Sequence, residues 1–218
     1  MAPSAPVVLF KNVLEIMDKG VNAATVMPLL KTQLTCFDSE TVDLLENYLF
    51  IWQDQQLSWK DGFSLPYGGI TAEDSDKDKE ILSNINTLAK GIYRVFAAAC
   101  NFGEENTAQD ILSAMYTIIG DLKAEEILTQ LITETADKEK ADLFVRQWEC
   151  AVDCINQLYR ICGNMVMRPR ELQELFMLMV QGTEIGFAPQ TQDCVLISTP
   201  PRMKTDAVKV VLVLGAAQ

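Results

Sequence analysis

The residues with the clearest chemical potential lie near the end of the chain, in a connector rich in turn-forming residues. Ser198 and Thr199 close a short β-branched stretch, and Arg202 and Lys204 follow two prolines. Hydroxyl groups beside two cations are suited to contacting phosphate, and loops at the carboxyl ends of sheet strands are where α/β proteins hold ligands. These four residues predict a phosphate or nucleic-acid contact, although a solvated turn explains the same composition.

Three cysteines, Cys150, Cys154 and Cys162, recur at helical spacing. An i, i+4 pair occurs on metal-binding helices, but structural zinc takes four ligands and the chain contains no histidine. We interpret the three as buried free thiols in a helical core. Disulfides are not expected, because the composition predicts a cytoplasmic protein.

The rest of the sequence offers little for catalysis. Histidine, the commonest general base, is missing, and neither GxGxxG nor a GxxxxGKS/GxxxxGKT phosphate loop occurs. Adjacent acids such as Glu104–Glu105 and Glu125–Glu126 point to different sides of a helix, as in solvated faces. The tryptophans and the nine methionines fall mostly on apolar stripes, which favours core packing. We therefore predict no catalytic, cofactor-binding or metal-binding residue in this chain.

The composition is that of a folded acidic protein. Of the 218 residues, 49% are hydrophobic and 22% are charged, and the formal net charge is −12. Residues 1–163 hold 25 acidic and 13 basic residues, whereas residues 164–218 are balanced with five of each. A nucleic-acid surface needs cations, so the acidic part is a poor candidate and only the last quarter is not repelled. No apolar run approaches the roughly 20 residues of a membrane span.

Apolar residues recur at helical spacing through the first three quarters of the chain, which predicts a bundle of about eight helices over residues 1–186. The expected helices cover 7–19, 22–34, 39–52, 81–99, 107–120, a short stretch around 127–132, 138–162 and 169–179. Gly20, Gly120 and Gly163 are the expected stops and Pro169 a first helical residue. Pro28 is expected either to kink its segment or to start a new turn. The breaker-rich stretch 62–69 and the charged run 73–80 predict a long surface loop.

The pattern changes at Phe187. Residues 194–199 and 208–214 are short, β-branched and apolar, which predicts two strands separated by a turn. A buried strand of this kind needs partners that the chain does not supply, so the sequence is expected to belong to a longer protein. The alternative is a small hairpin packed on the bundle.

Two segments resemble a known family. Leu45-Glu46-Asn47-Tyr48 through Trp52, with Trp59-Lys60 after it, resembles the "LENYxLxWG…W" segment of the AddB/RexB subunit of bacterial ATP-dependent helicase–nucleases. The tail from Phe187 to Gly215 is similar to that protein's "IPPxLDQVxVGxxxRSR…VKVVFVLG" segment. The resemblance covers most of the chain, with the middle matched by pattern alone.

The resemblance implies a place in a larger enzyme. Residues 1–186 correspond to the helical accessory domain (2B-like) of a helicase, and 187–218 to a partial return into its α/β motor domain. ATP, magnesium and an iron–sulfur cluster are implied only for other parts of the complete subunit. DNA and the A subunit of the heterodimer are the implied partners, in double-strand-break processing and recombinational repair.

The family's residues carry over only in part. Arg202 matches its "GxxxRSR" pattern, while Lys204 stands where a second arginine is usual and keeps the charge without the bidentate fork. By resemblance, both contact DNA phosphate in the intact subunit. A rival interpretation is an independent helical protein-interaction module with no nucleic-acid role.

Overall fold

The computed structural model describes residues 4–53, 58–69, 76–99, 105–183, 210 and 212. The chain divides into two compact units, Met1–Ile185 and Gly186–Gln218. All helices of the described residues belong to the first unit. Apart from the single positions Val210 and Leu212, the two predicted strands lie outside the described residues and stay predictions.

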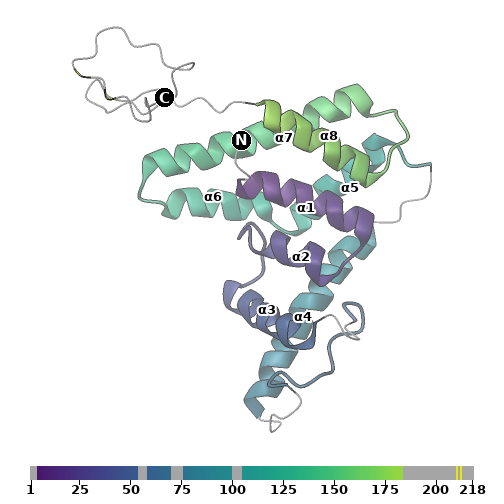
Figure 1. The fold of residues 1–218 in the computed structure, drawn as a ribbon, viewed down its shortest axis with the longest axis vertical. Helices are drawn as coiled ribbons and strands as arrows, with labels where there is room; N and C mark the ends of the chain where they lie inside the picture. Colours follow the sequence, from purple (N-terminus) through teal and green to yellow (C-terminus); the bar gives the residue numbers. More distant parts are fainter. Residues whose placement is uncertain are drawn as a thin grey trace, which may run out of the picture. The chain divides into compact units, whose positions relative to one another are not determined.

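The first unit is a helical bundle (Figure 1), which confirms the mainly α prediction. Within the described ranges the backbone forms eight helices and no sheet, with two isolated bridge pairs, Ser58–Gly62 and Thr107–Val166. The helices are α1 Ala5–Lys19, α2 Ala23–Leu30, α3 Ser39–Trp52, α4 Asp76–Ala99, α5 Ala108–Asp121, α6 Ala124–Glu134, α7 Lys138–Cys162 and α8 Pro169–Gly182. No helix of this part is long and apolar enough to cross a membrane.

Several helix ends follow from the expected signals. Gly20 follows α1 at a φ of 79°, a left-handed value that favours glycine. The Asp38 side chain accepts a hydrogen bond from the Thr41 N–H at the start of α3. Pro169 is the first residue of α8, where its missing N–H costs nothing.

Three expectations about helix boundaries were wrong. Gly120 lies inside α5, and the left-handed conformation falls instead on Lys123, whose φ is 56°. Asp76–Glu80 forms the first turn of α4, because acidic residues are favourable at a helix N-terminus. The helix expected to reach residue 34 ends at Leu30, two residues after Pro28.

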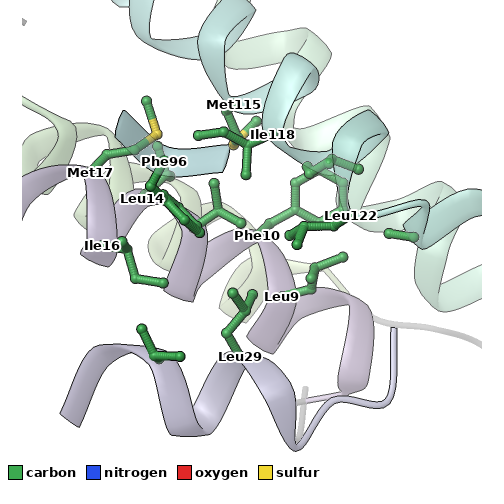
Figure 2. Packing of buried hydrophobic residues seen from close by; sticks show 14 of the residues in the cluster. Leu9, Phe10, Leu14, Ile16, Met17, Leu29, Phe96, Met115, Ile118 and Leu122 are labelled. Atoms are coloured by element: carbon green, nitrogen blue, oxygen red, sulfur yellow. The ribbon is translucent and has the colours of Figure 1, made fainter. Parts of the chain in front are cut away.

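Helix α1 lies at the centre of the bundle and packs against α2, α5, α7 and α8. Its side chains are buried around most of its circumference, and two faces are visible in Figure 2. Leu9 and Ile16 lie toward Leu29 of α2, while Phe10 and Leu14 lie on the side of α5. These four α1 side chains are at most 1% exposed. Burial of apolar surface on this scale is the main source of stability for such a bundle.

An aromatic cluster joins α1 to two helices from the end of the unit. The ring of Phe10 lies 5.5 Å from that of Trp148 in α7 and 6.1 Å from that of Phe176 in α8. Both pairs are tilted, which is a favourable geometry for aromatic rings. The contact holds residues together that are more than 130 positions apart in the sequence.

The expected surface loop is tied down in its described part, residues 58–69. The Asn86 side chain of α4 bonds both to the N–H and to the carbonyl of Phe63. The Tyr48 hydroxyl and the Trp52 indole of α3 donate to the carbonyls of Leu65 and Pro66, each at 3.1 Å. Trp59 and Phe63, two residues of this segment, have their side chains buried in the core. The segment is irregular, as expected, but it is part of the core.

Gly120 and Gly163 predict opposite effects of the same substitution. A Cβ at Gly120 meets no atom within 4 Å, so Gly120→Ala should raise the free energy of unfolding by about 0.5–1 kcal/mol through helix propensity. A Cβ at Gly163 would stand 2.5 Å from the Tyr159 carbonyl oxygen, so Gly163→Ala should lower it by about 1–3 kcal/mol. Urea unfolding followed by circular dichroism measures both. A shift of the two variants in the same direction would contradict this packing.

Candidate functional site

The phosphate-binding residues expected from the sequence, Ser198, Thr199, Arg202 and Lys204, lie outside the described residues. Their contact with phosphate therefore stays a prediction. The remaining candidate groups lie in the described part of the first unit, where each has a definite environment.

The cysteines have the environment of core residues. Cys154 and Cys162 are buried, which confirms the prediction for both, and Cys150 is half-buried. Burial, and to a lesser degree the neighbouring Cys150, raises the pKa of the Cys154 thiol. A raised pKa leaves less thiolate, the form that binds metals and attacks substrates. Within the described ranges, no three potential metal-ligating side chains of the Cys, Asp and Glu types come together.

The other expectations about side chains are mostly confirmed. Glu125 and Glu126 are exposed, as predicted for a solvated face. Trp59 is buried, and Trp52 and Trp148 pack against the core while staying partly exposed. Met165 is the exception among the described methionines assigned to the core, because 55% of its surface is exposed.

A cavity of about 360 Å³ opens between the end of α2 and the start of α3. Its lining mixes apolar and polar groups, and its lysine, Lys31, is already paired with Glu46 of α3. The lining residues are Leu30, Lys31, Gln33, Phe37, Ser39, Val42 and Asp43. A lysine that is already paired, one carboxylate and one hydroxyl group are not an arrangement that indicates a particular catalytic reaction.

The end of α7 and the turn that leads to α8 expose three apolar side chains close together in the sequence. They are Ile161, 71% exposed, Val166, 62% exposed, and Met165, 55% exposed. We call this surface, residues 160–168, the connector patch. It also contains Arg160 and Arg168, both exposed.

The backbone of the connector patch is held firmly against the start of α5. The N–H of Ala108 donates to the Met165 carbonyl at 2.8 Å, and that of Gln109 donates to the Gly163 carbonyl at 3.0 Å. In return, the Met167 N–H donates to the Asn106 carbonyl at 3.2 Å. Met165 and Val166 are therefore displayed on an ordered turn, because these bonds fix the backbone on both sides of them, while Ile161 lies in the last turn of α7.

A capping box fixes the start of α5 beside the patch. The Thr107 N–H and the Thr107 hydroxyl both donate to the Asp110 carboxylate, at 2.9 and 2.6 Å. The Asp110 N–H returns a bond to the Thr107 hydroxyl oxygen. The hydroxyl bond, followed by the backbone bond, lowers the pKa of Asp110.

The connector patch has the opposite charge character to the rest of the chain. No Asp or Glu occurs between Asp153 and Glu171, whereas Arg160, Arg168 and Arg170 do. Arg170 is paired with Glu174 at 3.0 Å, and Glu171 accepts the backbone N–H of Arg168. Among the described residues, neither Arg160 nor Arg168 forms an ion pair. Sequence reasoning did not single out this surface, although the acid-free stretch was visible in the sequence.

The first unit is thus a helical bundle in which Cys154 and Cys162 are buried and Asp110 helps to cap a helix. Comparison with curated proteins shows what the chain is similar to. It is 22% identical over 225 residues to the B subunit of the ATP-dependent helicase/deoxyribonuclease of Clostridium acetobutylicum, covering 96% of this chain and 19% of that protein. It is 25% identical over 217 residues to the protein of the same name from Clostridium kluyveri, with the same two coverages.

A third relative of the same name, from Clostridioides difficile, is 24% identical over 226 residues, which is 98% of this chain and 19% of the relative. These similarities confirm the resemblance to the AddB/RexB subunit. The chain spans about a fifth of the length of these curated relatives. No model of a known protein family matches it.

The lowered pKa of Asp110 predicts a pH-dependent contribution to stability. Because the folded-state pKa lies below the unfolded value of about 3.9, the contribution is complete above that value and is lost as the pH falls through the folded pKa. The stability difference between wild type and Asp110→Asn should therefore be constant near neutral pH and shrink below about pH 4. Urea titrations at several pH values measure it.

Asp121 in the last turn of α5 provides the matched control. Asp121→Asn removes the same charge from the end of the helix where a negative charge is unfavourable, so it should not destabilise the protein. A wild-type advantage over Asp110→Asn that is as large at pH 3 as at pH 7 would contradict the assignment.

Proposed function

We propose that this chain acts as a helical domain within the B subunit of an ATP-dependent helicase–deoxyribonuclease. The observation that carries the proposal is the alignment of nearly the whole chain with about a fifth of each such protein. The mainly helical fold agrees with the accessory-domain role that the resemblance implies. The process served is double-strand-break processing and recombinational DNA repair in the cytoplasm.

The role we propose for the domain itself is non-catalytic. Among the described carboxylates, those of Asp110 and Glu15 have a lowered pKa. The main cause at Asp110 is a hydrogen bond from Thr107, which caps the same helix, and the main cause at Glu15 is a hydrogen bond from Lys19 in the same helix. The thiol with a raised pKa is buried. These environments agree with a structural role, which we propose consists in orienting DNA and contacting the companion A subunit. ATP, magnesium and an iron–sulfur cluster belong to other parts of the proposed enzyme.

Within this proposal, Arg202 and Lys204 contact DNA phosphate, with Ser198 and Thr199 beside them. The support is their charge in the balanced last quarter of an otherwise acidic chain, together with the matching position of Arg202 in the family's pattern. An independent protein-interaction module is the second candidate function, and the exposed connector patch is the observation that favours it.

Salt-dependent DNA binding tests the proposed function. The measurement is the slope of log affinity against log salt concentration for a labelled single-stranded oligonucleotide, in the complete heterodimer. Arg202→Ala with Lys204→Ala should make this negative slope shallower by about 1.4, because each lost phosphate contact removes about 0.7. Lys60→Ala with Lys138→Ala, two exposed lysines elsewhere, is the control and should leave the slope unchanged. An unchanged slope in the Arg202→Ala, Lys204→Ala variant would contradict the proposed phosphate contact. ATP hydrolysis by the purified chain would contradict the proposed non-catalytic role.

A further inference from the structure

We propose that the connector patch, residues 160–168, is a docking surface for an acidic and apolar segment of a protein partner. The inference rests on the proposed function, in which that partner is the companion A subunit. The surface differs from the predicted phosphate site, which lies in residues 198–204. Nothing in the resemblance assigns a role to the turn between α7 and α8.

The apolar part of the patch has the properties of an interface centre. Single exposed apolar residues are common on protein surfaces, but Ile161, Met165 and Val166 lie within six residues of one another, and each is more than half exposed. The backbone at Met165 and Val166 is fixed by hydrogen bonds to the start of α5, and Ile161 lies in α7, so little conformational entropy of the backbone is lost when a partner covers them. Apolar side chains on a preorganised turn fit the desolvated centre of a protein interface.

The charges around this centre identify the chemistry of the partner. Arg160 and Arg168 lie at the two ends of the patch and pair with no described carboxylate. Three acids near the patch are engaged elsewhere: Asp110 caps α5, Glu171 bonds to the Arg168 backbone, and Glu174 pairs with Arg170. Among the described residues, Glu105, beside Asn106, is exposed and forms no ion pair with either arginine. A partner with carboxylates at the rim of an apolar strip complements this arrangement. Arginine is also the cation most enriched at energetic centres of interfaces.

A nucleic acid fits the surface less well than a protein does. Three aliphatic or thioether side chains at the centre offer nothing to phosphate, and the chain as a whole carries a net charge of −12. An aromatic platform on which bases could stack is not part of the nine residues. The protein partner is therefore the occupant to which the observations point.

The experiment measures binding of the purified 218-residue chain to the purified A subunit encoded in the same genome, by titration calorimetry at low and high salt. Arg160→Glu with Arg168→Glu should weaken binding at least tenfold at low salt and reduce its salt dependence. Met165→Ser with Val166→Ser should weaken it about tenfold at either salt concentration. Thermal unfolding by circular dichroism verifies that each variant is folded.

Matched controls change the same chemistry elsewhere. Lys60→Glu with Lys138→Glu reverses two exposed charges, and Phe50→Ser removes an apolar side chain that is 79% exposed at the end of α3. Both controls should bind within about twofold of wild type. Equal losses in the controls and the patch variants, or no loss in the patch variants, would overturn the docking surface while leaving the proposed assembly in place.

The remaining outcomes also separate the possibilities. A wild-type chain that does not bind the A subunit contradicts the assembly on which the inference rests. If light scattering shows that the wild-type chain is a dimer and that the same patch variants are monomers, the surface belongs to a second copy of the chain. If the wild-type chain binds a labelled single-stranded oligonucleotide and Arg160→Glu with Arg168→Glu does not, the surface belongs to nucleic acid. Either of the last two results overturns the protein-partner proposal.

Discussion

The packing of Phe10 against Trp148 and Phe176 is the contact on which the bundle depends most. It joins α1 to α7 and α8, while another face of α1 covers α2 through Leu9 and Ile16. Truncation of a buried phenylalanine to alanine costs about 3–5 kcal/mol, a large part of the stability of a domain. A helix buried on several sides cannot be released without opening the neighbours that surround it.

This central packing also determines where the connector patch is displayed. α5 and α7 both pack on α1, and the turn after α7 is bonded to the first residues of α5. The turn is thereby fixed at a corner of three helices, with Ile161, Met165 and Val166 facing outward. The arginines of this stretch contrast with the excess of acidic residues in the chain as a whole.

The sequence predicted the helices well because their signals are local. The capping box of Thr107 and Asp110, the glycine after α1 and the proline that opens α8 each act within one turn of the backbone. Gly120 misled because a glycine permits a left-handed conformation without requiring it, and Lys123 adopts that conformation three residues later.

What the sequence could not reveal depends on contacts between distant residues. The Asn86 side chain holds the loop through hydrogen bonds to the backbone of Phe63, 23 positions earlier in the sequence. Neither an asparagine nor a phenylalanine in the sequence predicts such a contact. Helical periodicity likewise shows that α7 has an apolar side, but not which part of it another helix covers. The exposure of Ile161 and Met165 therefore emerges only from the packed structure. The phosphate-binding hypothesis for Arg202 and Lys204 rests on the sequence alone.

Native-state hydrogen exchange tests the central position of α1 most directly. We predict that the buried amides of α1 exchange only with the free energy of global unfolding, since four helices must move to expose them. Between Leu128 and Ala151 no residue is buried, so amides of α6 and of the first half of α7 should exchange through openings of lower free energy. Faster exchange in α1 than in α6 would contradict the central position of α1.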